Sequence, residues 1–169
     1  MVHRGFEIHP EVPLEGMPLE EYFPNASQMF GGLKAMGQPY GVAFNHLTMM
    51  PNTNLALQVA EYAKEMGLSE TYNKLMYKAT FVDDVNISLK EEIDRIALLA
   101  GFTESDLQAV YSTDKYKKIL EDNKLYCQTH NISSVPTFII NDEYAIVGAQ
   151  GPESFKKIFQ QLKTGKKMF

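Results

Sequence analysis

Apolar residues between positions 52 and 129 recur every three or four residues, which is the spacing of helices with one buried face. Residues that can cap a helix precede these repeats, and Gly67 ends the first of them. The pattern therefore predicts a series of helices that start near Asn52, Ser69, Ser88, Thr103 and Thr113. An earlier helix is predicted at 26–36, ended by Gly37 and Pro39.

Two of these starts carry specific predictions. Ser88-Leu89-Lys90-Glu91 has the form of a capping box, in which the serine hydroxyl and the glutamate carboxylate each accept a backbone N–H. Ser69 can cap the helix before it. The last helix of the series predicts a buried stripe of Tyr116, Leu120, Asn123 and Cys127.

Strand patterns stand near both ends of the chain. Phe6 and Ile8 alternate with polar neighbours, which predicts a strand over residues 2–8, and the Pro- and Gly-containing run 9–18 predicts a loop. Residues 136–140 are apolar and favour a strand, and a turn at 141–143 predicts a hairpin with 144–147. A final helix follows from Pro152, with a core-facing stripe of Phe155, Ile158, Phe159 and Leu162. The predicted class is α/β with a helical insertion.

Composition limits the classes of function. The chain has 169 residues, 44% hydrophobic and 22% charged, as in an ordinary soluble domain. A net charge of -5 argues against a nucleic-acid partner, which would call for a basic face. No apolar run approaches the about 18 residues that span a bilayer, and the N-terminus has no apolar export core. We therefore expect a cytoplasmic protein with no membrane partner.

Metal and cofactor chemistry is not indicated. The four histidines are scattered without partner ligands at useful spacing, and there is one cysteine, Cys127. Cys127 is predicted late in a helix and on its apolar stripe, which favours structural burial. It is still the one candidate nucleophile, although the C-terminal end of a helix disfavours a thiolate. His130 follows it by three residues and is interpreted as a residue of the helix end.

The most informative motif is Ser134-Val135-Pro136-Thr137, which leads into the predicted hairpin. An X-Pro bond before an apolar strand is commonly an ordinary trans bond at a strand edge. A cis bond in this position leaves the N–H and C=O of the preceding residue able to pair with an extended chain. The order of helix, proline loop, hairpin, Val-Gly-Ala-Gln and proline-started helix resembles thioredoxin-like folds, which hold a cis proline at this position.

Several blocks in this order resemble the DsbA-like oxidoreductases of the FrnE type over nearly the whole chain. These blocks are 5–16, Pro51-Asn52-Thr53 with Ala56, 76–81, Val135-Pro136-Thr137-Phe138 and Val147-Gly148-Ala149-Gln150. The resemblance implies a thioredoxin-like fold interrupted by a helical domain, with residues 1–16 and 132–169 in the thioredoxin-like part and 17–131 in the inserted helical subdomain. It also implies protein thiol–disulfide exchange with protein or peptide substrates, bound at Ser134, Val135, Pro136 and Thr137.

The chain departs from this family at its N-terminal end. Family members begin with a strand and a Cys-x-x-Cys pair at a helix start, where the first cysteine attacks and the second resolves the mixed disulfide. This sequence contains no such pair. We therefore expect an N-terminally incomplete fold with weak or no redox activity alone. The lost central strand would leave two sheet edges that a homodimer, a direct pairing of the flanking strands or another segment could fill.

Other functions stay open on the sequence alone. One is a non-catalytic peptide-binding or scaffold protein that retains the proline loop. Its thiol-independent peptide binding would be lost when Pro136 is changed to Ala. Another is a relative of the glutathione-dependent isomerases and kappa-type transferases, which glutathione would protect against heat. A third is a truncated product whose encoding DNA carries the missing motif upstream.

Overall fold

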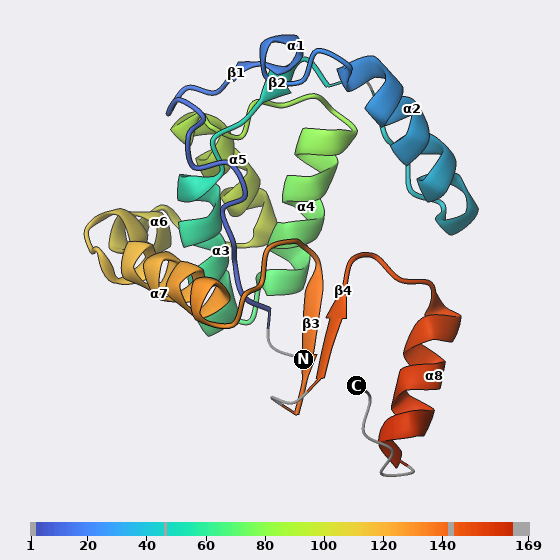
Figure 1. The fold of residues 1–169 in the computed structure, drawn as a ribbon. Helices are drawn as coiled ribbons and strands as arrows, with labels where there is room; N and C mark the ends of the chain where they lie inside the picture. The colour runs from blue at the N-terminus through green and yellow to red at the C-terminus, as the bar shows by residue number, and fades with distance from the viewer. Residues whose placement is uncertain (1–2, 46, 142–143, 164–169) are drawn as a thin grey trace. The chain divides into compact units, whose positions relative to one another are not determined.

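The computed structural model describes residues 3–45, 47–141 and 144–163 (Figure 1). The chain forms two compact units, Met1–Lys124 and Leu125–Phe169. The boundary between them falls inside the helix Lys115–Thr129. The sequence-based grouping of residues 1–16 with 132–169 stays a prediction.

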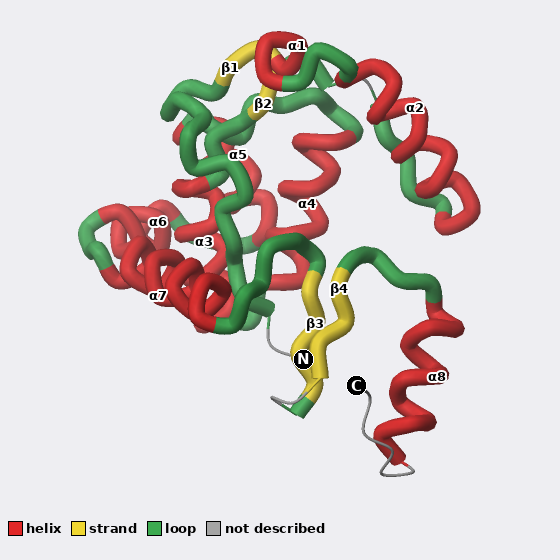
Figure 2. The backbone as a smooth tube through the Cα atoms, viewed as in Figure 1, coloured by secondary structure: helices red, strands yellow, loops and turns green. Residues whose placement is uncertain are grey.

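The first unit is mainly helical and contains the predicted helices together with two short helical segments, at 19–22 and 38–40, that were not predicted (Figure 2). The helical segments are α1 (Leu19–Tyr22), α2 (Ala26–Gly37), η1 (Gln38–Tyr40), α3 (Asn54–Glu65), α4 (Ser69–Phe81), α5 (Lys90–Ala100), α6 (Glu104–Tyr111) and α7 (Lys115–Thr129). A short antiparallel pair joins β1 (Met17–Pro18) to β2 (Met49–Met50). The helix predictions from periodicity are thus confirmed to within a few residues.

The core of this unit explains why the helices form. Val59 and Ala63 of α3 are fully buried, as are Ile93 and Ala97 of α5. Each pair is four residues apart, so each helix presents one apolar face to the same cluster. The hydroxyl of Tyr72 in α4, itself buried, donates to the carbonyl of Ala56 at 3.1 Å. The Tyr72 ring is therefore buried with its hydroxyl hydrogen-bonded.

The second unit contains the predicted hairpin and the last helix, α8 (Pro152–Lys163). β3 (Thr137–Ile140) and β4 (Tyr144–Val147) are antiparallel, with Phe138 opposite Ile146. The ring of Phe138 meets that of Phe155 on α8 edge-on, with centroids 5.0 Å apart. Of the predicted turn, residues 142 and 143 lie outside the described residues.

One predicted strand is wrong. The described part of the first segment, residues 3–8, forms no strand. Its backbone is instead held by side chains of the helices, since Gly5 N–H donates to Glu61 and Gly5 C=O accepts from Asn123. The alternation of Phe6 and Ile8 carries no information about these long-range partners.

Two predicted helix caps are also wrong. Leu89, not Ser88, is the N-cap of α5, and it makes no side-chain cap. The Ser88 hydroxyl oxygen instead accepts a hydrogen bond from the backbone N–H of Asn52, at 2.7 Å. Ser69 is the first residue of α4 and does not cap it. A tertiary contact thus displaces the local capping pattern.

The predicted core stripe of α8 is not buried. No residue of this helix, all of which is described, is buried in the structure. Phe159 is 49% exposed, although the stripe has the spacing of an inward face. Periodicity therefore predicts the helix correctly but not the burial of its apolar side.

A capping box does form at α6, where Thr103 is the N-cap. The Thr103 hydroxyl and N–H both donate to the Asp106 carboxylate, at 2.6 and 2.8 Å, and the Tyr62 hydroxyl donates to it at 2.9 Å. These donors, led by the Thr103 hydroxyl, lower the pKa of Asp106. A lowered carboxyl pKa stabilises the fold above the unfolded-state pKa, and this contribution disappears as pH falls through the folded-state pKa.

Changing Asp106 to Asn is therefore expected to destabilise the protein at neutral pH and to matter less in acid. The check is the urea midpoint of wild type and Asp106→Asn at neutral pH and below the normal aspartate range. Asp122→Asn is the control, because the carboxylate of Asp122 is exposed and lies 3.8 Å from Lys118. An equal difference in urea midpoint between wild type and Asp106→Asn at both pH values would contradict the lowered pKa of Asp106.

Candidate functional site

The proline loop, residues 134–137, connects the end of α7 to β3. The chain turns out of α7 at Asn131, whose φ of 54° is left-handed, and Ile132 N–H donates to Cys127 C=O at 2.8 Å. The loop then runs over the surface of its unit, with Ser134, Val135 and Pro136 exposed and Thr137 half-buried. The structure thus brings together the four residues predicted as the binding site.

The loop is held on both sides of Val135. The hydroxyl of Thr137 donates to the carbonyl of Ser134 at 2.7 Å. The N–H of Gly148 donates to the carbonyl of Pro136 at 2.8 Å, and φ of Gly148 is +84°. The Val135–Pro136 peptide bond is cis. These contacts fix the backbone without using the polar groups of Val135.

Val135 consequently has unused main-chain groups. Within the described residues, neither its N–H nor its C=O makes a hydrogen bond. Its side chain is 44% exposed, so water reaches this part of the loop. An exposed donor and acceptor on one residue can pair with the main chain of an extended polypeptide.

Apolar side chains flank this position. In the register of the hairpin, Thr137 lies opposite Val147, and these residues share a face with Ile139. Val147 is 55% exposed and Ile139 is 38% exposed. The hairpin that follows the loop thus exposes apolar side chains on the face that carries Thr137.

Cys127 lies third from the end of α7, as predicted late in a helix. It is half-buried, so the prediction of burial on the apolar stripe holds for Tyr116, Leu120 and Asn123 but not for Cys127. His130 stacks on Tyr126, with ring centroids 4.0 Å apart, and its Nδ1 lies 2.8 Å from the Tyr126 carbonyl oxygen. His130 is therefore part of the helix end.

A concave feature lies in the helical unit and includes none of the four predicted loop residues. It is an apolar cavity of about 350 Å³ lined by Val42, Ala43, Phe44, Tyr77, Phe81 and Val82. Asn45 ties this segment to the end of α4, because its N–H donates to the Phe81 carbonyl and its side-chain amide donates to the carbonyl of Val82, the residue after the helix. The pattern of the sequence contained no signal for it beyond scattered aromatic residues.

The described residues contain no group of three or more His, Cys, Asp or Glu side chains placed to hold a metal ion. Among the described helices, none is both long and apolar enough to cross a membrane.

Comparisons with known proteins agree with this fold. Residues 1–160 match the model of the DSBA-like thioredoxin domain. The chain is 27% identical over 156 residues to the uncharacterized protein YwbO of Bacillus subtilis strain 168, covering 90% of this chain and 76% of that protein. Its fold is similar to the crystal structure of a probable DsbA oxidoreductase from Streptomyces coelicolor, with a TM-score of 0.86, 21% identity, and coverage of 99% of this chain and 77% of that chain. The chain belongs to the DsbA-like thioredoxin domain family.

Proposed function

We propose that this chain serves protein thiol–disulfide exchange as a substrate-binding part, with the proline loop holding an extended segment of the substrate. The observation that carries the proposal is the pair of unused main-chain groups on exposed Val135. A substrate strand would donate to the Val135 carbonyl and accept from its N–H, while Ile139 and Val147 contact apolar side chains.

The redox step itself is not expected from these 169 residues. A disulfide exchange cycle needs an attacking thiolate and a second thiol that resolves the mixed disulfide. The chain offers Cys127 alone, half-buried near the end of α7. The Cys-x-x-Cys pair that FrnE-type oxidoreductases carry would have to come from outside this sequence.

We also propose that the protein is cytoplasmic and that it dimerises through a sheet edge. In the described part of the second unit, the sheet is two-stranded, so β3 and β4 each have one edge without a neighbour. Exposed edges of apolar strands favour association with another strand. Size-exclusion chromatography with light scattering tests this point, and a monomer at all concentrations would contradict it.

A second candidate function is thiol-independent peptide binding by a scaffold protein. The same free groups of Val135 favour it, since main-chain pairing needs no cysteine. The glutathione-dependent alternative predicts instead that reduced glutathione raises the melting temperature. Peptide binding without any effect of glutathione would favour the proline-loop function over that branch.

Changing Thr137 to Val should weaken peptide binding about three- to tenfold, because the loop loses the hydrogen bond that holds the Ser134 carbonyl. Binding is measured by calorimetry with carboxymethylated insulin B chain, whose thiols are blocked. Thr129→Val is the matched control, since the Thr129 hydroxyl also donates to a carbonyl, that of Leu125, but within α7.

Two further results decide this experiment. N-methylation of the amides in the central part of the peptide should abolish binding if the contact is between main chains. Equal losses for Thr137→Val and Thr129→Val, or unchanged binding of the methylated peptide, would contradict the proposed site.

A further inference from the structure

Most of the buried polar side chains described for the helical unit hydrogen-bond to one segment of the chain. We call residues 4–16 the strap, because they run along the helices without forming a helix or strand of their own (Figure 1). Asn52, Glu61 and Asn123 are at least 93% buried, and each bonds the main chain of the strap. Burying polar groups is costly unless they are bonded, so these residues have a specific role in holding the strap.

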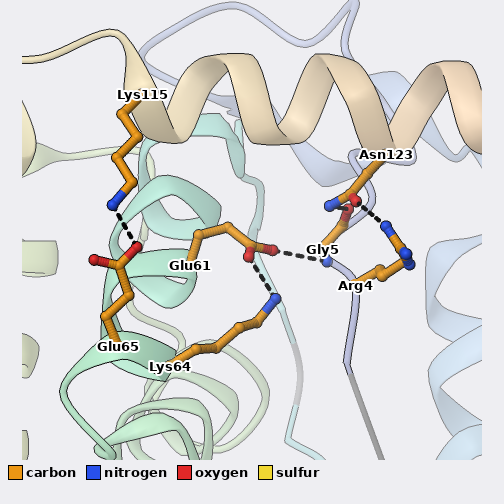
Figure 3. Close-up of polar contacts among 7 residues, drawn as sticks. All are labelled: Arg4, Gly5, Glu61, Lys64, Glu65, Lys115 and Asn123. Atoms are coloured by element: carbon orange, nitrogen blue, oxygen red, sulfur yellow. Dashed lines mark hydrogen bonds and ion pairs between the residues drawn. The ribbon is translucent and has the colours of Figure 1, made fainter.

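Both main-chain groups of one strap residue are held, and by different helices. Gly5 N–H donates to Glu61 Oε1 of α3 at 3.1 Å (Figure 3). Gly5 C=O accepts from Asn123 Nδ2 of α7, also at 3.1 Å. Arg4 extends the contact by donating to Asn123 Oδ1 at 3.2 Å.

The charge of Glu61 is balanced within its own helix. Lys64, one turn further along α3, pairs with Glu61 Oε2, and the Lys64 side chain is 31% exposed against 6% for Glu61. One carboxylate oxygen thus faces Lys64 while the other faces the strap. Glu61 is therefore a buried acceptor for Gly5 that does not need a second charge on the strap.

The strap also approaches α3 closely at this point. A Cβ atom on Gly5 would lie 3.0 Å from Glu61 Oε1 and 3.2 Å from the Leu120 side chain. A side chain at position 5 would therefore crowd Glu61 and Leu120, which would have to shift by a few tenths of an ångström to make room for it. The close approach and both buried hydrogen-bond partners thus involve the same residue, Gly5.

We propose that Glu61 and Asn123 act as one two-sided clamp, which couples release of the strap to the separation of α3 from α7. Glu61 can hold Gly5 only while Asn123 keeps the same peptide segment in place, and the reverse is also true. The clamp makes the N-terminal strap and the α3–α7 packing open together as one cooperative element. This inference is independent of the function proposed for the proline loop.

The structure supplies a matched control on the same two helices. Glu65, one turn after Glu61 on α3, pairs with Lys115 of α7 at 2.7 Å (Figure 3). This ion pair is about half exposed, links α3 to α7, and involves no strap residue. Removing it tests whether any link between the helices controls the strap, or only the clamp.

The experiment is hydrogen exchange of the Gly5 and Phe6 amides by NMR in Glu61→Ala, Asn123→Ala, the double variant and Glu65→Ala. Each clamp variant should raise exchange at Gly5 by about tenfold or more, and the double variant should add little. Glu61→Gln, which keeps an acceptor oxygen, should restore protection, and Glu65→Ala should leave it unchanged. Unchanged exchange at Ile93 shows that the core stays folded.

Asn123→Ala is the decisive variant, also if Glu61→Ala fails to fold. It removes the bond to Gly5 C=O, whereas the readout is the N–H that Glu61 accepts. Independent bonds would leave Gly5 exchange unchanged in Asn123→Ala, and that result would overturn the clamp. Equal deprotection by Glu65→Ala would also overturn it.

Discussion

Replacing Ile93 by alanine is expected to lower the free energy of unfolding of the helical unit by about 2–5 kcal/mol. Ile93 is fully buried on α5 and belongs to the cluster that joins α3 to α7. Truncation removes apolar burial and leaves a cavity, which close-packed helices refill only partly. Because domains are marginally stable, such a loss is a large share of the total.

The measurement is urea unfolding followed by circular dichroism. Leu99→Ala is the control on the same helix, because Leu99 is 66% exposed, and its effect should stay within about 0.5 kcal/mol. Similar midpoints for the two variants would mean that α5 does not bury the face assigned to it.

The helical half of the fold was predictable because its signal is local. Val59 and Ala63, or Ile93 and Ala97, stand four residues apart in the sequence and on one face in the structure. Pro152 likewise marks the first residue of α8 in both. Periodicity and helix-start residues depend on a few neighbouring positions, so the helices that they predict form in the structure with small changes at the helix ends.

The strap and its partners were not predictable for the opposite reason. Gly5 and Asn123 are 118 residues apart, and the Asn52 amide reaches the Val12 carbonyl across 40 residues. Such contacts replace the strand pairing that the Phe6 and Ile8 alternation predicts, and a similar contact removes Ser88 from its expected cap. A pattern of side chains does not record which distant group will satisfy a backbone N–H.

The candidate site falls between these cases. The loop residues 134–137 were named from the sequence, and the structure has them exposed or half-buried where the chain enters β3. The bonds that hold the loop, from Thr137 to Ser134 and from Gly148 to Pro136, were not visible in the sequence. Within the described residues they leave the N–H and C=O of Val135 without a hydrogen bond.

The second large effect concerns redox activity, where the expected result is its absence. Family chemistry requires a reactive thiolate and a resolving thiol, and both must be accessible to a substrate disulfide. Cys127 has no second cysteine in the chain, and its position near the C-terminal end of α7 opposes a negative charge. The chain should therefore bind peptides at the proline loop without reducing their disulfides.

The most direct test of this separation between binding and chemistry is the reduction of insulin by dithiothreitol, followed by turbidity, with the 169-residue chain and its Cys127→Ser variant. We predict that neither protein accelerates the reaction over dithiothreitol alone, while both bind carboxymethylated insulin B chain equally well. A clear acceleration by the wild-type chain that disappears in Cys127→Ser would contradict this prediction and identify Cys127 as the nucleophile.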